Sequence, residues 1–173
     1  MDISKTIEAK SDQLNADDLI GTSKILKITD VKVIAGDQPV HIFYEGDNGK
    51  PYRPSKGMRR LIMVAWGAES DCYIGRSLKV YNDQSVKWAG KEVGGIRISA
   101  MSNIPGTLKI ALTLSKGMRV PYSVDVLAVK TIDDMRRDCI EAIKLKGIEP
   151  PLEKINGAQN KQELTLIYKE SIA

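Results

Sequence analysis

The chain has few of the side chains that usually carry metal binding or catalysis. Its 173 residues include two cysteines, Cys72 and Cys139, and one histidine, His41. The cysteine spacing matches neither a metal ribbon nor a redox pair, so we expect two reduced, partly buried thiols. A single histidine has no second imidazole with which to share a metal, and we expect it to have a structural place in an apolar strand.

Several longer signatures are also missing. The sequence contains no Walker loop, no dinucleotide fingerprint and no nucleophile elbow. The acid pairs Asp17-Asp18 and Asp133-Asp134 stand where helices are expected to begin, and the helix dipole accounts for acids at such positions. We therefore expect a protein that is not an enzyme and that uses no cofactor and no metal.

Long apolar runs are absent too. No stretch approaches the roughly 20 apolar residues that a membrane helix requires, and the first ten residues lack the apolar centre of a signal peptide. With 42% hydrophobic and 28% charged residues, the composition is typical of a globular domain. We expect a cytoplasmic protein with no membrane partner.

Positive charge is present, and it is unevenly distributed. The formal net charge is +4, yet residues 1–20 hold two basic and five acidic side chains, and residues 128–173 hold eight of each. Residues 21–127 hold sixteen basic and nine acidic side chains, so the whole excess lies in this segment. Clustered positive charge favours a polyanionic partner. A solvated basic surface that maintains solubility is the alternative explanation.

Residues 51–100 combine cations with aromatic rings. This window holds nine basic residues against four acids, and five of the nine aromatic residues of the chain. Cations that follow a phosphate backbone, next to rings on which bases stack, are what a single-strand binder needs. The residues expected to contact nucleic acid are Arg53, Lys56, Arg59, Arg60, Arg76, Lys79, Tyr81, Lys87, Trp88, Lys91 and Arg97.

The aromatic residues have more than one interpretation. Trp66 falls on the apolar face of an expected helix and should be buried in the core. Tyr81 and Trp88 lie on expected strands, where strand alternation allows either a core position or a platform for bases. Tyr44 and Tyr52 flank a turn, so we expect them to be exposed.

The hydrophobic periodicity predicts a chain of strands interrupted by one helix and followed by helices. Ser55 is expected to cap the first helix and Gly67 to end it, and glycines at 90, 94 and 95 predict a turn and a sharp bend. The expected strands are 24–34, 40–44, one near Tyr52, 77–81, 86–88, 93–101, 107–114 and 120–127, and the later helices are 131–147 and one from about 160.

This order of elements favours a mainly β fold with helices. Three strands, a helix and two more strands are the order of an oligonucleotide-binding (OB) fold, a five-stranded partly open barrel. We expect an OB-like barrel with an inserted helix, an extra β-hairpin and a C-terminal helical tail. The corresponding organisation is a polar N-terminal arm at 1–20, the barrel at 21–127 and the tail at 128–173. An SH3-like barrel or a mixed α+β sheet fits the same string of elements.

The sequence also resembles a group of small OB-like proteins encoded by tailed phages and prophages. The resemblance covers residues 12–127 and lies in the runs "ADDLIG", "KITDVKV" and "RRLIMVAWGAESDCYIGRSLKVYNDQSVKWAGKEVGGIRI". Its recurring elements are the helix end at Gly67, the Gly75-Arg76 strand entry and the strand beginning Gly95-Ile96-Arg97. The tail "EPPLEKINGAQNKQELTLIYKE" is similar to helical segments at the ends of phage recombination proteins. The resemblance implies DNA binding beside phage replication or recombination genes.

Together these observations predict a non-enzymatic single-stranded DNA-binding protein of a phage-type replication or recombination system, acting in the host cytoplasm. The alternative is a phage protein-interaction or anti-defence module that binds a host protein or a small phosphorylated nucleotide. In either case the C-terminal helices offer a surface for a homo-oligomer or a protein partner.

Overall fold

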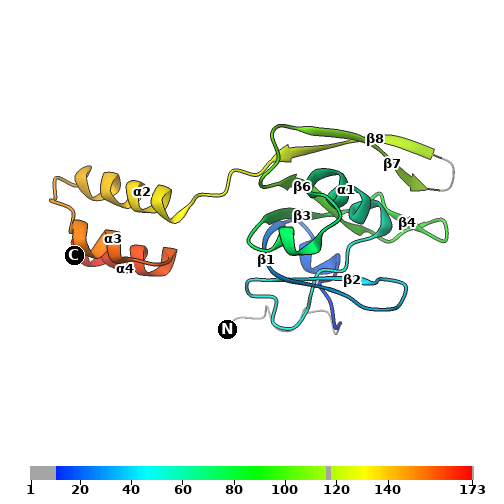
Figure 1. The fold of residues 1–173 in the computed structure, drawn as a ribbon, viewed down its shortest axis with the longest axis horizontal. Helices are drawn as coiled ribbons and strands as arrows, with labels where there is room; N and C mark the ends of the chain where they lie inside the picture. The colour runs from blue at the N-terminus through cyan, green and yellow to red at the C-terminus, as the bar shows by residue number, and fades with distance from the viewer. Residues whose placement is uncertain (1–10, 116–117, 173) are drawn as a thin grey trace. The chain divides into compact units, whose positions relative to one another are not determined.

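The computed structural model describes residues 11–115 and 118–172, and the chain divides into two compact units, Met1–Leu127 and Ala128–Ala173. In the described residues the first unit holds every strand together with helix α1 (Lys56–Trp66), and the second unit holds helices α2, α3 and α4 (Figure 1). A mainly β fold with helices is therefore confirmed.

The first unit is built on one mixed sheet of six strands. They are β1 (Ser23–Val33), β2 (Val40–Tyr44), β3 (Ser77–Asp83), β6 (Gly95–Met101), β7 (Leu108–Ser115) and β8 (Met118–Val126), in the order β2-β1-β3-β6-β8-β7. All neighbouring pairs are antiparallel except β6 and β8, which are parallel. Strands β2 and β7 are the two edges, so the sheet does not close into a barrel within the described residues.

Strand β1 serves two partners, because it is interrupted by a bulge. Its first half pairs with β3 and its second half pairs with β2, and the register shifts between Ile28 and Asp30. A bulge adds a residue to one strand and increases the local bend. Leu26 and Ile28 point into the core before the bulge, whereas Val31 faces the core side after it. The strand thus curves around the core.

Helix α1 forms as its sequence predicts. The Ser55 side chain accepts a hydrogen bond from the Met58 backbone N–H, which caps the first turn. The helix ends at Gly67, whose φ of 92° lies in the left-handed region that a residue with a side chain rarely adopts. Met58 and Trp66 lie on its buried face. The predicted core position of Trp66 is therefore confirmed.

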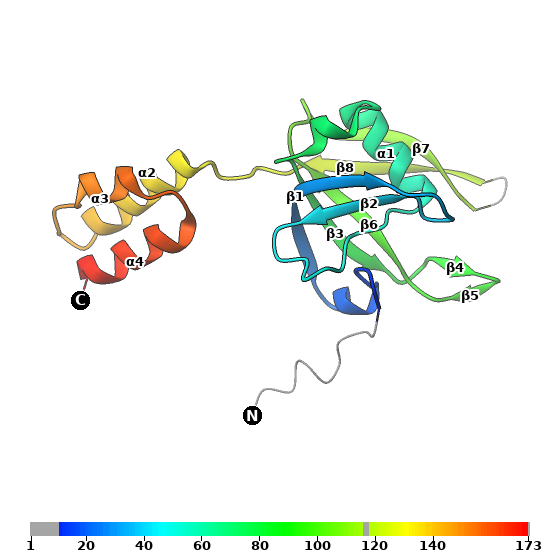
Figure 2. The same cartoon turned by 60° about the horizontal axis from the view of Figure 1, so that its bottom comes forward.

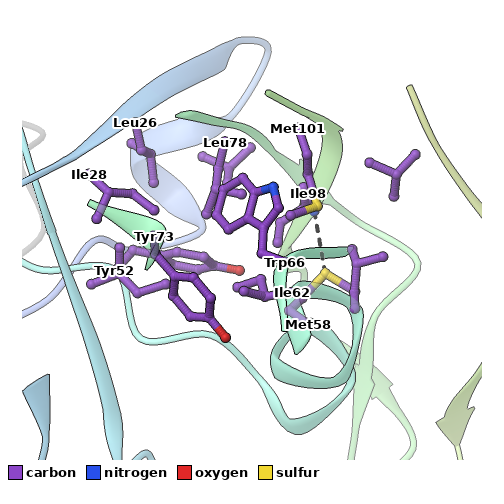
Figure 3. Close-up of a cluster of buried hydrophobic side chains, with 14 of the residues drawn as sticks. Leu26, Ile28, Tyr52, Met58, Ile62, Trp66, Tyr73, Leu78, Ile98 and Met101 are labelled. Atoms are coloured by element: carbon purple, nitrogen blue, oxygen red, sulfur yellow. Dashed lines mark hydrogen bonds between the residues drawn. The ribbon is translucent and has the colours of Figure 1, made fainter. Parts of the chain in front are cut away.

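The core combines side chains of α1, such as Met58 and Trp66, with side chains of the strands, such as Leu78 and Ile98 (Figure 3). The Trp66 indole N–H donates to the Ser102 carbonyl at 2.9 Å, and its ring lies 5.5 Å from that of Tyr73. The Ile98 backbone N–H points at the Met58 sulfur at 3.4 Å. Leu14 and Leu19, from the segment expected to form a polar arm, are also buried in this core.

A small two-stranded hairpin separates β3 from β6. It consists of β4 (Lys87–Trp88) and β5 (Lys91–Glu92), joined by Ala89 and Gly90. Both joining residues have positive φ, 49° and 81°, as a type I′ turn requires. Beyond the hairpin, a Cβ on Gly95 would lie 2.9 Å from a methyl of Val86. The predicted turn and close bend at these glycines are confirmed.

The second unit consists of α2 (Ile132–Lys144), α3 (Leu152–Gly157) and α4 (Lys161–Ile172). Thr131 and Asp134 form a reciprocal capping box at the start of α2. The unit has its own small core of Cys139, Ile143, Ile155, Ala158 and Leu164. Among the described helices, none has the length and apolar character needed to cross a bilayer.

The two thiols differ in exposure. Cys139 is buried between α2 and α4, whereas Cys72 is exposed in a short 3-10 helix, Ser70–Tyr73. The expectation of two partly buried thiols is therefore wrong for Cys72, because it lies at the surface between α1 and β3. Both thiols are free.

Candidate nucleic-acid interface

One face of strands β1 and β3 points away from the core. Leu78 and Val80 are fully buried, so alternation places Lys79 and Tyr81 on the opposite side of β3. The register sets Lys79 opposite Ile25 and Tyr81 opposite Ser23. Ile25 is 56% exposed. We call the surface formed by Ile25, Lys27, Lys79 and Tyr81 the outer face.

The β4–β5 hairpin continues from the same part of the sheet. It projects beyond the ends of β3 and β6 in both ribbon views (Figure 2). Lys87 and Lys91 are exposed on it, and the Lys87 ammonium lies 3.4 Å from the Glu92 carboxylate. Trp88 belongs to β4, but its side chain lies outside the described residues. The hairpin lysines thus lie on the segment that connects β3 to β6, and the register, in which Lys87 pairs with Glu92 and Lys91 pairs with Trp88, places them on opposite faces of the hairpin.

Two of the predicted arginines contact other side chains of the first unit. The Arg53 guanidinium donates to the Asp12 carboxylate at 2.7 Å, and that contact holds the pKa of Asp12 below its usual value. The Arg76 guanidinium lies over the Trp66 ring, 5.4 Å from its centroid, which is a cation–π distance. Both side chains are half-buried and support the fold from the edge of the core.

Arg97 lies inside the molecule. Its side chain is 9% exposed, and its Nε lies 3.5 Å from the Asp83 carboxylate, an ion pair longer than a hydrogen bond. One terminal nitrogen lies 3.9 Å from the position that a Cβ on Gly57 would occupy, so the first turn of α1 covers it. Sequence alternation predicted a surface cation here. The structure places it under cover, because α1 and Tyr122 lie beside this end of β6.

Tyrosines gather around this arginine. The Tyr122 hydroxyl donates to the Ile98 carbonyl at 2.7 Å, and Tyr52 is 1% exposed. Burial raises the pKa of both tyrosines, while the nearby Arg97 charge acts in the opposite direction. The Tyr52 hydroxyl has no hydrogen-bond partner among the described residues. A polar cluster thus lies within the unit beside the outer face.

Two of the aromatic predictions are wrong. Tyr44 and Tyr52 were expected to be exposed beside a turn, but both are buried in the core. Tyr44 is the last residue of β2 and shares its inward side with Ile42, which is fully buried. Burial raises the pKa of Tyr44 to about 12. Tyr52 meets Ile42 in an isolated bridge, which takes the place of the predicted third strand.

Phe43 is an accessible ring that the sequence reasoning missed. It is half-buried on the side of β2 opposite Ile42 and Tyr44, and the Lys32 ammonium lies 5.1 Å from its ring centroid. Lys32 pairs with His41 across β1 and β2. The alternation of Val40–Tyr44 was the signal, because two inward residues in a five-residue strand leave His41 and Phe43 on the other side.

The cations of α1 lie around a pocket. A cavity of about 350 Å³ between α1 and the β1–β2 pair is lined by Val31, Val33, Ile42, Ile62, Met63 and Tyr73, together with Lys56, Arg59 and Arg60. None of these three cations pairs with an acidic side chain in residues 11–115 or 118–172. The Arg59 Nε also lacks a hydrogen-bond partner there. Lys79 and Tyr81 do not line this pocket.

Metal ligands do not converge in the part of the chain that the structure describes. No group of three or more His, Cys, Asp or Glu side chains there is placed to hold a metal ion. His41 lies half-buried in β2, beside Lys32.

Comparison of the chain with protein-family models, with curated proteins and with solved structures found no match.

Proposed function

We propose that this protein binds single-stranded DNA without catalysing a reaction, through the outer face and the β4–β5 hairpin. The observation that carries the proposal is the connectivity of residues 23–101. Strands β1 and β2, the Tyr52 bridge, helix α1 and strands β3 and β6 follow one another in the order of an OB fold. Strand β1 pairs with both β2 and β3, so these elements wrap around one core.

The positions of two connections support the same proposal. OB folds bind oligonucleotides with a strand face and with the loops between strands 1 and 2 and between strands 4 and 5. In OB order, β3 and β6 are the fourth and fifth strands. The β4–β5 hairpin, with Lys87 and Lys91, is therefore the second of these loops. The segment at 34–39 is the first.

The chemistry of the outer face suits a single strand better than a duplex. Ile25 and the half-buried Tyr81 offer apolar and aromatic surface to unstacked bases, and such contacts tolerate any sequence. Lys79 and Lys91 supply cations with no ion-pair partner among the described residues. A phosphate must compete with Glu45 for Lys27, at 2.6 Å, and with Glu92 for Lys87, at 3.4 Å. Each phosphate that these lysines neutralise releases counterions, so the affinity must fall as salt rises. The resemblance to phage proteins makes phage replication or recombination the setting that we propose.

The test is a titration of labelled single-stranded DNA, duplex DNA and RNA of equal length at several salt concentrations. We expect the tightest binding to single-stranded DNA. Lys87→Glu with Lys91→Glu should weaken that binding and make it less dependent on salt. The negative slope of log K against log salt should become shallower by about 1.4, since each lost phosphate contact removes about 0.7.

Lys144→Glu with Lys146→Glu makes the same charge change in exposed residues of the second unit and serves as the matched control. Absence of oligonucleotide binding at low salt would refute the proposal. Equal weakening by both double variants would show that net charge, and not the hairpin, accounts for the binding.

Exposed aliphatic side chains of the second unit favour a second role, self-association. Leu145 is 80% exposed, and Leu152 and Leu166 are also exposed. Residues 128–173 carry equal numbers of basic and acidic side chains, so two copies approach without net repulsion. We propose a second copy of this chain as the partner. Sedimentation of the full chain and of Leu145→Glu with Leu166→Glu tests this, and a variant that stays in the same oligomeric state contradicts it.

A further inference from the structure

The pocket beside α1 has an apolar interior that reaches the surface. Ile42, Ile62 and Tyr73 form a buried floor, and Val33 and Met63 stand at the opening with 73% and 52% of their surfaces exposed. At about 350 Å³ the cavity lies at the lower end of the range for ligand pockets, enough for one or two large side chains. Exposed apolar side chains grouped around a cavity form the kind of surface to which an apolar part of a partner can dock.

The charges at the opening are all positive and uncompensated. Lys56, Arg59 and Arg60 line the pocket, and no acidic residue lines it. They occupy the first turns of α1, where the helix dipole already disfavours cations, and the first turn contains no acid. An anion bound here would therefore relieve repulsion among three cations and the helix N-terminus.

The interior distinguishes between possible anionic ligands. A nucleotide base needs hydrogen-bonding groups along its edges or an open aromatic face. Ser70 is the only uncharged polar side chain in the pocket besides Tyr73, and the Tyr73 hydroxyl already donates to the Gly67 carbonyl. Aliphatic walls instead suit an aliphatic or aromatic side chain, which needs no polar partner.

We propose that this pocket binds an acidic segment of a partner protein, with one or two large apolar side chains in the cavity and flanking carboxylates on Lys56, Arg59 and Arg60. Arg59 is half-buried and lines the pocket, so its guanidinium is placed to hold a carboxylate close to the apolar interior. The site is separate from the outer face and the hairpin. It gives the protein a place to recruit a second protein that uses none of the residues proposed to contact DNA.

The probe for this site is a fluorescein-labelled peptide in which a Leu-Phe pair is flanked by three aspartates on each side. Two further peptides carry Ser-Ser in place of Leu-Phe, or asparagine in place of every aspartate. Anisotropy with the full-length protein should show binding of the first peptide and at least roughly tenfold weaker binding of the other two. Equal binding of the Ser-Ser peptide would overturn the inference, because the cavity would then contribute nothing.

Variants of the protein locate the site. Val33→Thr with Met63→Gln removes apolar surface from the opening and keeps strand and helix propensities, and it should weaken the peptide several-fold while leaving oligonucleotide affinity unchanged. Val64→Gln is the matched control, since Val64 is exposed on α1 but does not line this pocket. Loss of peptide binding in the control variant would overturn the assignment to this pocket.

Charge reversal separates this inference from the proposed DNA binding. Arg59→Glu with Arg60→Glu should weaken the acidic peptide at least roughly tenfold. The inference fails if this variant weakens the affinity for single-stranded DNA by a similar factor while Val33→Thr with Met63→Gln leaves the affinity for the peptide unchanged. The helix cations would then belong to a general polyanion-binding surface. A protein that binds the peptide but no oligonucleotide supports the pocket and refutes only the DNA proposal.

Discussion

Strands β3 and β6 and the hairpin between them carry positive charge in two regions that differ in exposure to solvent. Within the strands, Arg97 is covered by α1 and faces the Asp83 carboxylate. Beyond the strand ends, Lys87 and Lys91 are exposed on the hairpin. The guanidinium has several donors in a fixed plane and suits a covered site with fixed partners, whereas the ammonium of lysine is strongly hydrated and stays in water. A count of cations along the sequence therefore overstates what a ligand can reach.

The largest expected effect is a loss of stability at alkaline pH, which arises from tyrosines buried or half-buried in the first unit. Burial raises the pKa of Tyr44 to about 12, and it also raises the pKa of Tyr52 and Tyr122. An unfolded tyrosine ionises near pH 10, so the unfolded chain loses these protons first. The free energy of unfolding should be unaffected by these groups below about pH 10 and should fall as the pH rises towards about 12.

Denaturant midpoints measured in steps across this range, together with tyrosinate absorbance, check the alkaline prediction. Tyr44→Phe should lose less stability over the same interval than the parent protein. Full ionisation of all tyrosines near pH 10 in a protein that remains folded would contradict it.

The next effect concerns Arg97 itself. Arg97→Met keeps much of the side-chain volume but leaves Asp83 without its cation, and we expect a loss of about 2 kcal/mol in the free energy of unfolding. Arg119→Met, an exposed residue of β8, should change stability by less than about 0.5 kcal/mol. Urea unfolding of both variants measures the difference. If the two variants lose the same stability, Arg97 is not the fixed internal cation that the contrast requires.

The smallest expected effect belongs to Tyr81, whose side chain contacts Tyr122 and which is the cross-strand neighbour of the covered Arg97. Tyr81→Ala should weaken the binding of single-stranded DNA by about 1 kcal/mol, roughly fivefold in affinity, because a half-buried ring offers only part of a stacking surface. Tyr81→Phe keeps the ring and should bind like the parent protein. An equal loss in both variants would assign the effect to the hydroxyl rather than to stacking.

Local signals in the sequence were sufficient for the elements that depend on neighbouring residues. Helix α1 begins after its cap Ser55 and ends at Gly67, and Thr131 caps α2. The glycines near 90 and 95 produce the turn and the bend. These features are set by backbone conformation and by hydrogen bonds over a few residues, so they can be predicted without knowledge of the fold.

Features that depend on a second layer could not be predicted in this way. Alternation along β6 points Arg97 to the face of the sheet that Ile98 does not use. Only the tertiary structure shows that α1 covers Arg97 there. Tyr44 and Tyr52 flank a polar turn, yet Tyr44 pairs with the buried Ile28 and Tyr52 with the buried Ile42, so both lie in the core. The pocket beside α1 was equally invisible, because its walls come from strands and a helix that are distant in the sequence.

The divided pairing of β1 has a consequence for how the chain folds. Its second half meets β2 across a short turn, so this contact closes a small loop and costs little chain entropy. Its first half pairs with β3, which follows β2 and α1 in the sequence, so this contact closes a much longer loop. We expect the β1–β2 pair to be protected from hydrogen exchange early in refolding, and the backbone amides of Ser23–Lys27 to gain protection in a later, slower step.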